Sequence, residues 1–131
     1  MPYIPRKQKK RAYQPPKRKF QRRHDDSKFY ATPRWRKTRK VYLNRHPFCQ
    51  ICLWQNKVSE AKALDHLIRV QSGGAKFDIR NLMGMCERHH NIKSGKETHN
   101  PILIDYTRND DGDMIPKNRE DIMKIYEKGG G

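Results

Sequence analysis

Three cysteines and one histidine of this chain occur as two close pairs. Cys49 and Cys52 form a C-x-x-C pair, and Cys86 and His89 form a C-x-x-H pair, with 33 residues between Cys52 and Cys86. Each pair can close a tight knuckle that points two donor atoms at one ion, and tetrahedral zinc accepts three thiolates and an imidazole. The spacing therefore predicts a zinc-ribbon-like Cys3His structural zinc site that uses every cysteine. Buried free cysteines are the alternative interpretation.

A structural ion would help this chain to fold. Only 34% of its 131 residues are hydrophobic, which leaves room for one domain with a small core, plus tails. Zinc can contribute on the order of 10 kcal/mol to folding. The three cysteines do not form a disulfide framework and no secretory signal is visible, so a reducing, cytoplasmic location is expected. No apolar run approaches the roughly 20 residues that cross a bilayer, and no membrane partner is expected.

A second set of polar residues lies among the predicted zinc ligands: Asp65, His66, Asn81 and His90. Taken singly, each has an ordinary explanation as a surface carboxylate, a hydrogen-bonded histidine or a turn residue. Histidine, however, has an unperturbed pKa near 6.5 and can accept a proton from water at neutral pH. A carboxylate and an imidazole can also bind a divalent ion. Together these residue types suit metal-assisted hydrolysis of a phosphodiester.

The order of these motifs resembles a known family. A "DH" at the end of a strand, "GG" in the next loop, "NL" opening the next strand and "C-x-x-H-H-N-x-K" entering a helix are similar to the HNH nucleases. The upstream "FYATPRWRKTRKVYLNRHPFCQIC" resembles the lead-in of small phage HNH endonucleases that are often encoded beside DNA-packaging (terminase) genes. The likeness runs from about Phe29 to Glu97. It implies an α+β protein with a ββα-metal core.

The resemblance also implies a role for each residue of the second set. His66 would be the general base, and Asn81 would orient the loop that carries it. Asp65 and His90 would bind one catalytic divalent cation, Mg²⁺, Mn²⁺ or Ni²⁺, and leave coordination sites open. On an extended strand, neighbouring side chains such as Asp65 and His66 point to opposite sides unless the strand end is distorted.

The activity implied by the resemblance is that of a metal-dependent HNH endonuclease. It would nick or cleave double-stranded DNA by hydrolysis, leaving 5′-phosphate and 3′-hydroxyl ends. The setting would be phage DNA processing or packaging in the cytoplasm of a bacterial host, with the terminase machinery as a partner.

Two positions depart from the family pattern. The family usually has a cysteine where His89 stands, which changes one zinc donor without removing it. It commonly has a proline where Arg69 stands, and the arginine adds a positive charge where a phosphate backbone would pass. Arg69, Lys93 and Lys96 are predicted DNA contacts, with solvated surface charge as the alternative for each.

A basic helix is expected to precede the first zinc knuckle. Thr32 suits an N-cap and Pro33 suits the first helical position. Trp35, Thr38 and Tyr42 recur at helical spacing, while the other faces carry Arg and Lys.

Short strands should position the second set of residues. A strand within 61–70 is expected to end at the Asp65-His66 pair, and a second strand is expected within 81–86. The "QSGG" loop between them has two glycines that can take positive φ. A short helix should follow across 89–97.

The tail shows a different pattern. Two apolar runs flank a polar turn from Asn109 to Gly112, which predicts a hairpin. A helix capped by Asn118 and stopped by Gly129 is expected to follow.

Positive charge is concentrated near the N-terminus. Residues 1–45 carry 17 Lys and Arg but only two acidic residues, so they hold +15 of the total charge of +16. A polyanion such as double-stranded DNA is the expected partner. We predict a disordered basic arm over 1–28, an HNH nuclease domain with structural zinc over 29–98, and a hairpin and helix extension over 99–131.

Two other hypotheses remain open. A non-catalytic zinc-ribbon protein would bind nucleic acid through the basic arm without cleaving it. An interaction protein would dock a packaging complex through its tail and cleave only with that partner. A metal-dependent nicking assay separates these hypotheses from the first.

Overall fold

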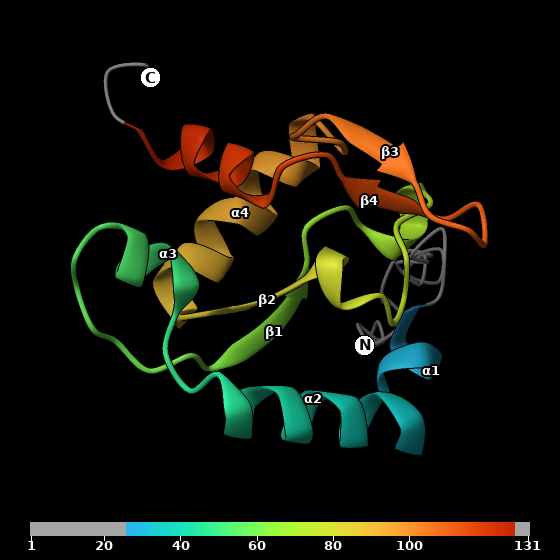
Figure 1. The fold of residues 1–131 in the computed structure, drawn as a ribbon, viewed down its shortest axis with the longest axis horizontal. Coiled ribbons are helices and arrows are strands. Elements are labelled where there is room, and N and C mark those ends of the chain that lie inside the picture. Colours follow the sequence, from blue (N-terminus) through green and yellow to red (C-terminus); the bar gives the residue numbers. More distant parts are fainter. Residues whose placement is uncertain (1–25, 128–131) are drawn as a thin grey trace, which may run out of the picture.

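The computed structural model describes residues 26–127 of the chain. They form an α+β protein built from short elements (Figure 1). In chain order the α-helices and strands are α1 (Asp26–Tyr30), α2 (Pro33–Arg45), α3 (Gln50–Trp54), β1 (Ala63–His66), β2 (Leu82–Met85), α4 (Glu87–His99), β3 (Tyr106–Arg108) and β4 (Met114–Pro116). Three 3-10 helices complete the list: η2 (Val70–Ser72), η3 (Ile79–Asn81) and η4 (Arg119–Tyr126).

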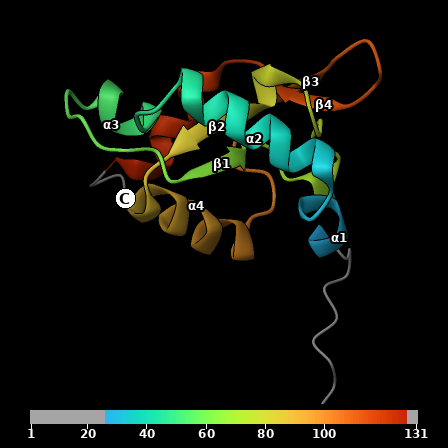
Figure 2. The same cartoon turned by 90° about the horizontal axis from the view of Figure 1, so that it is seen from below.

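The centre of the fold is an antiparallel pair, β1 and β2, followed directly by α4. Asp65 pairs with Met83, and His66 pairs with Leu82 at the end of the ladder. Both α2 and α4 contact β1, which lies between them in the view of Figure 2. The predicted order of strand, loop, strand and helix is confirmed, and β1 ends at His66 as expected.

The start of α2 follows from its cap. The side-chain oxygen of Thr32 accepts a hydrogen bond from the backbone N–H of Trp35 at 3.2 Å, and Pro33 occupies the first position of the helix. Trp35 is buried against Leu64 and Leu82, so it joins the helix to both strands. The predicted basic helix and its cap are confirmed.

The predicted disordered arm, 1–28, lies almost wholly outside the described residues. Its last three residues belong to α1, so the prediction of disorder is wrong for those three. The physical reason is aromatic packing just after them. The rings of Phe29 and Tyr30 lie 5.3 and 5.5 Å from the ring of Trp35, which ties α1 to α2.

The extension after residue 98 packs into the core formed with the preceding residues. The predicted hairpin is confirmed as β3–β4, which pairs Thr107 with Ile115. Ile104, Met114 and Ile122 belong to the same buried cluster as Cys49 and Cys52. The boundary predicted at residue 98 therefore does not separate two cores.

The helix predicted after Asn118 is present but differs in type. Asn118 caps it by accepting a hydrogen bond from the backbone N–H of Glu120 at 3.1 Å. It is a 3-10 helix that ends at Tyr126, and the predicted stop at Gly129 lies outside the described residues. Ile122, which is fully buried, faces the core and explains why this segment is held against α4.

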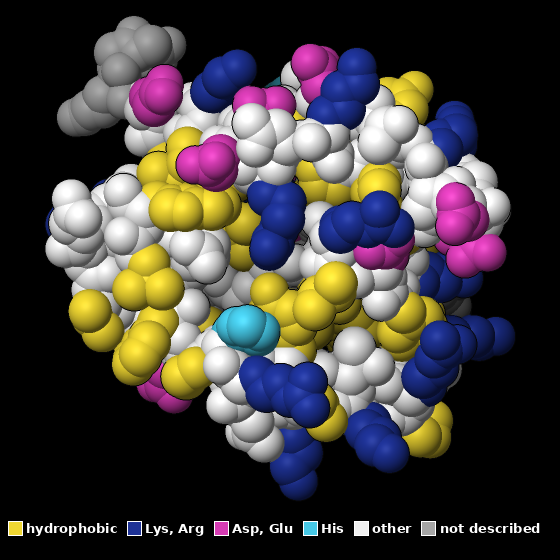
Figure 3. Space-filling view, viewed as in Figure 1, with side chains coloured by type: hydrophobic (Ala, Val, Ile, Leu, Met, Phe, Trp, Pro, Cys, Tyr) yellow, Lys and Arg dark blue, Asp and Glu magenta, His cyan; other side chains and the backbone are white. Residues whose placement is uncertain are grey.

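The surface is rich in cations. Lys and Arg side chains gather along the lower edge of the molecule in Figure 3, where α2 lies. Among the described helices, none is long and apolar enough to span a membrane.

Candidate active site and metal centre

The two predicted zinc knuckles meet in one buried cluster. Nδ1 of His89 lies 3.5 Å from Sγ of Cys49, 3.5 Å from Sγ of Cys52 and 3.3 Å from Sγ of Cys86. All four donor atoms lie within 4.8 Å of one another. A tetrahedral ion with bonds of about 2.0–2.3 Å places its donors roughly 3.4–3.8 Å apart. The Cys3His cluster therefore has the size of a tetrahedral metal site.

Two helix starts aim the donors of this cluster. Cys49 is the N-cap of α3, a helix that the sequence patterns did not predict, and its Sγ accepts from the backbone N–H of Cys52. Cys86 is the N-cap of α4 and places His89 in the first turn. Burial lowers the pKa of His89, which keeps its imidazole neutral, as a metal ligand must be.

Tyr126 is a neighbour of the cluster that the sequence patterns did not predict. Its hydroxyl donates a hydrogen bond to the backbone carbonyl of His89 at 2.8 Å, and its ring meets the His89 ring edge to face at 4.9 Å. Burial raises the pKa of Tyr126, so its hydroxyl stays protonated as a donor. A tyrosine 37 residues further along the chain carries no local signal for this contact.

His66 is buried at the end of β1, and each of its two ring nitrogens lies near a polar group. Nε2 lies 3.0 Å from the backbone carbonyl of Lys76, and because a carbonyl can only accept, Nε2 carries the hydrogen. Nδ1 is then the basic nitrogen, and it lies 3.4 Å from the hydroxyl of Tyr30. The indole of Trp35 stacks on the imidazole at 4.9 Å with 25° between the planes. This environment orients Nδ1 as the proton acceptor.

Asn81 holds the loop that follows His66. Its Oδ1 accepts from the N–H of Ile68 at 2.8 Å, while its Nδ2 donates to the carbonyls of Ile68 at 3.0 Å and Ala75 at 2.9 Å. The amide is fully buried. Asn81 thus closes the loop between β1 and β2 by hydrogen bonds, which is the role that the family resemblance implied.

The glycines of this loop serve different needs. Gly73 has a φ of 107°, in the region that favours glycine. Gly74 has no positive φ, but a Cβ there would lie 1.8 Å from the carbonyl oxygen of Ile68. The expectation of positive φ is therefore met at Gly73, whereas Gly74 allows a close backbone approach.

Asp65 and His90 face one another across the gap between β1 and α4. Oδ1 of Asp65 lies 3.9 Å from Nδ1 of His90. Nδ1 of His90 is buried and has no hydrogen-bond partner among the described residues. One divalent ion with bonds of about 2.1 Å can bridge two donors at this separation. The pair fits a divalent ion and leaves further coordination sites to water or substrate.

The general-base candidate and the candidate metal ligands share one cleft of about 530 Å³. Asp65, His66 and His90 all line it, although Asp65 and His66 are neighbours on β1. Burial alternates along β1 as far as His66, so His66 is buried and Asp65 is partly exposed where the two residues line the cleft. Arg39, Lys62 and Arg69 also line this cleft.

The prediction of a phosphate contact at Lys93 is wrong. Its side chain is fully buried, and its Nζ lies 3.0 Å from Oδ2 of Asp65, 2.5 Å from Oε2 of Glu97 and 2.9 Å from the carbonyl of His66. A buried ammonium that donates hydrogen bonds to two acceptors and forms an ion pair with Asp65 cannot reach DNA. Lys93 lies about one helical turn after His90, on the face of α4 that packs into the protein.

The other two predicted DNA contacts lie nearer solvent. Arg69 is half-buried in the cleft wall, where it donates to the side chain of Gln71 and to the carbonyl of Glu97. Lys96 is exposed on α4 and is not among the residues that line the cleft.

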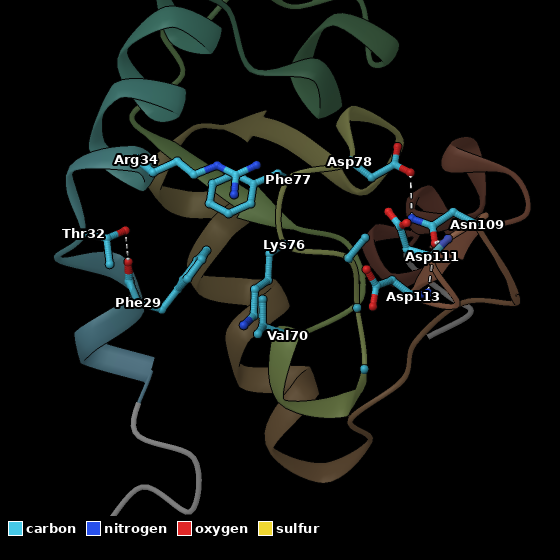
Figure 4. Close-up of a pocket in the computed structure, with 13 residues that line it drawn as sticks. Phe29, Thr32, Arg34, Val70, Lys76, Phe77, Asp78, Asn109, Asp111 and Asp113 are labelled. Atoms are coloured by element: carbon cyan, nitrogen blue, oxygen red, sulfur yellow. Dashed lines mark hydrogen bonds between the residues drawn. The ribbon is translucent and has the colours of Figure 1, made fainter.

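A second cavity, of about 740 Å³, lies beside the loop that follows β1. Arg34 covers the ring of Phe77 at 3.8 Å, and Asp78 accepts from Asn109 at 3.0 Å. This cavity has an acidic wall, which does not suit a polyanion. Figure 4 shows its two sides, one with Asp78, Asn109, Asp111 and Asp113 and the other with Phe29, Arg34 and Phe77.

Comparisons with known proteins relate this arrangement to HNH endonucleases. The HNH endonuclease family matches residues 49–96, a segment that contains the four residues of the Cys3His cluster, β1, β2 and most of α4. Among solved structures, the chain is similar to the HNH endonuclease of the deep-sea thermophilic bacteriophage GVE2, solved with a manganese ion. The two share 28% identity with a TM-score of 0.50, over 56% of this chain and 82% of that one. No curated protein matches the chain.

The family match and the structural match agree with the geometry. The family match covers the segment that holds the Cys3His cluster and the β1–β2 strand pair. Residues 49–96 of this chain therefore form a domain of the HNH endonuclease family.

Proposed function

We propose that the protein is a metal-dependent endonuclease that hydrolyses phosphodiester bonds in double-stranded DNA. The observation that carries this proposal is a single cleft in which Nδ1 of His66 is the basic nitrogen and Asp65 and His90 face one another. Membership of residues 49–96 in a nuclease family and the net charge of +16 support a DNA substrate.

In the proposed reaction, His66 acts as the general base. A water molecule gives a proton to Nδ1, its oxygen bonds to phosphorus, and the bond from phosphorus to the 3′ oxygen breaks. The 3′ oxygen takes up a proton, so the products are 5′-phosphate and 3′-hydroxyl ends. The Tyr30 hydroxyl, at 3.4 Å, is a long contact that an incoming water can replace.

Two metal sites with different tasks belong to this proposal. Zinc at the Cys3His cluster would join α3 to α4 and so hold the domain together. Asp65 and His90 would hold a divalent ion, Mg²⁺, Mn²⁺ or Ni²⁺, which supplies positive charge beside the phosphoryl oxygens when bound. The related phage enzyme was solved with manganese, which makes Mn²⁺ the first ion to test.

A nicking assay on supercoiled plasmid tests the activity. The wild-type protein, loaded with zinc, should convert the plasmid to nicked or linear DNA only when Mg²⁺, Mn²⁺ or Ni²⁺ is added. His66→Ala should lower the rate by about 10²- to 10⁴-fold, the usual contribution of a general base. End-labelling should find 5′-phosphate and 3′-hydroxyl ends.

A matched histidine serves as the control. His99 is exposed in the last turn of α4, and His99→Ala should cleave at the wild-type rate. Equal activity in His66→Ala and wild type would rule out the proposed base. Tight DNA binding without cleavage in any of the three ions would favour a non-catalytic binding protein.

We also propose a setting in phage DNA processing or packaging, inside the host cytoplasm. Similarity to a phage enzyme supports this part of the proposal. A partnership with the terminase is testable by adding the packaging motor to the nicking assay, where a partner-dependent enzyme would gain activity.

A further inference from the structure

The burial of Lys93 leaves the cleft in need of another cation for the substrate. Arg69 is already engaged with Gln71 and the carbonyl of Glu97, and Lys96 is absent from the cleft lining. A DNA duplex approaching His66 carries one negative charge per nucleotide, so its backbone needs cations at the mouth of the cleft. Two further cations line the cleft, one on α2 and one directly before β1.

Arg39 reaches the rim of the cleft from the middle of α2. Its Nη2 donates a hydrogen bond to the backbone carbonyl of Lys62 at 2.9 Å, and the side chain lines the cleft together with Asp65 and His66. The bond to a backbone group holds the guanidinium in place while most of its five N–H donors remain for a ligand. Among the described residues, no carboxylate forms an ion pair with Arg39.

The adjacent Lys62 adds a second positive charge to the rim. It lines the same cleft, its side chain is 63% exposed, and its ion pair with Glu60 is long, at 3.9 Å. An exposed pair of this kind contributes little and can be exchanged for a phosphate. α2 contains no acidic residue, so no negative side chain on that helix weakens the positive electrostatic potential around Arg39.

A guanidinium held by a hydrogen bond, with an exposed ammonium beside it, can bind the two non-bridging oxygens of a backbone phosphate. Arginine binds phosphate through two parallel N–H bonds, and lysine adds a point charge. From these contacts we infer that Arg39, with Lys62, binds a backbone phosphate of the DNA at the rim of the cleft. This inference rests on the proposed nuclease function, and it assigns to α2 the task of holding the duplex over His66.

Binding of a DNA duplex to proteins that carry His66→Ala tests the inference without cleavage. Relative to this parent, adding Arg39→Gln should weaken binding about tenfold, as one charge-assisted contact. It should also lower the slope of log affinity against log salt by about one, the value for one lost phosphate contact. Lys62→Gln should change both quantities in the same direction.

Arg45→Gln is the matched control for charge. Arg45 also lies on α2, but it lines a different groove with Val41 and Ile79. By helical geometry it is displaced about 120° around the axis from Arg39. Arg45→Gln should therefore leave the salt slope unchanged while removing the same charge.

Cleavage kinetics with otherwise wild-type protein provide a second readout. Arg39→Gln should raise KM about tenfold and leave kcat nearly unchanged, because a rim phosphate is held equally before and during the reaction. Equal salt slopes and KM values for Arg39→Gln and Arg45→Gln would overturn the inference. If Arg39→Gln does not fold, an unchanged salt slope in Lys62→Gln overturns it instead. Absence of cleavage by wild type would defeat the proposed function alone, since the binding assay still tests Arg39.

Discussion

The ammonium nitrogen of Lys93 lies 3.0 Å from Oδ2 of Asp65, in the interior of the protein. Oδ1 of the same carboxylate faces Nδ1 of His90 at 3.9 Å. One oxygen of Asp65 is thus tied to an internal cation, and the other is turned toward the candidate metal position. Glu97, at 2.5 Å from the same ammonium, completes a group of three charges at the wall of the cleft.

Lys93→Met should destabilise the protein strongly. The substitution keeps the length of the side chain but leaves the partly buried carboxylates of Asp65 and Glu97 without their cation. Removing one partner of a buried ion pair costs about 3–5 kcal/mol. Urea unfolding of the zinc-loaded protein measures the loss. Lys96→Met, at an exposed position on the same helix, should stay within about 0.5 kcal/mol of wild type.

His89→Ala and His90→Ala should fail in different ways. His89→Ala removes a donor from the Cys3His cluster, so zinc stoichiometry and helical circular dichroism should fall together. His90→Ala should keep one zinc and the fold, while half-maximal cleavage requires at least about tenfold more divalent ion. Elemental analysis beside a metal titration of cleavage separates the two. Zinc loss in His90→Ala would contradict this division.

A cysteine in place of His89 should preserve the cluster. A thiolate is a normal zinc donor, and the site would become four cysteines. His89→Cys should therefore retain one zinc per chain but lose the ring contact with Tyr126. Its unfolding midpoint should fall between those of wild type and His89→Ala. Stability equal to His89→Ala would mean that packing, and not metal binding, is the main task of His89.

Asn81→Ala should loosen the loop that carries the base. It leaves the N–H and carbonyl of Ile68 and the carbonyl of Ala75 without their partner. An unpaired buried polar group costs about 1–3 kcal/mol, so we expect a loss of roughly 2–4 kcal/mol. Hydrogen exchange of the amides of residues 67–75 should rise and kcat should fall. Asn44→Ala, at an exposed position of α2, should change neither quantity.

The stability supplied by Asp78 should depend on pH. Hydrogen bonds from Arg80, and a further one from Asn109, hold the pKa of Asp78 well below its usual range despite partial burial. A carboxyl with a depressed folded-state pKa stabilises the fold above its unfolded pKa of about 3.9, and this contribution is lost as pH falls below that value.

Asp78→Asn tests this dependence. Its deficit in unfolding free energy relative to wild type should be full at pH 6 and should shrink toward pH 3. Both proteins keep the same cysteines, so acid loss of zinc affects them alike and the difference isolates Asp78. A deficit that stays constant from pH 6 to pH 3 would contradict the assignment.

Local patterns were sufficient to predict much of this protein. The Cys49, Cys52, Cys86 and His89 spacing predicted the donor cluster, because two short knuckles carry their own geometry. Thr32 predicted the start of α2, since an N-cap bond joins residues only three apart. The end of β1 at His66 followed from a short apolar run.

Contacts between distant residues were decided only by the tertiary structure. Lys93 looked like a surface cation in the sequence, but the packing of α4 against β1 placed it between Asp65 and Glu97. The carbonyl of Lys76, which selects the tautomer of His66, and the Arg39 bond to Lys62 have no sequence signature. A sequence therefore determines which groups are available along the chain. Which of them are buried, paired or turned toward the substrate depends on long-range packing, because desolvation and hydrogen bonding are set by neighbours that only the fold brings together.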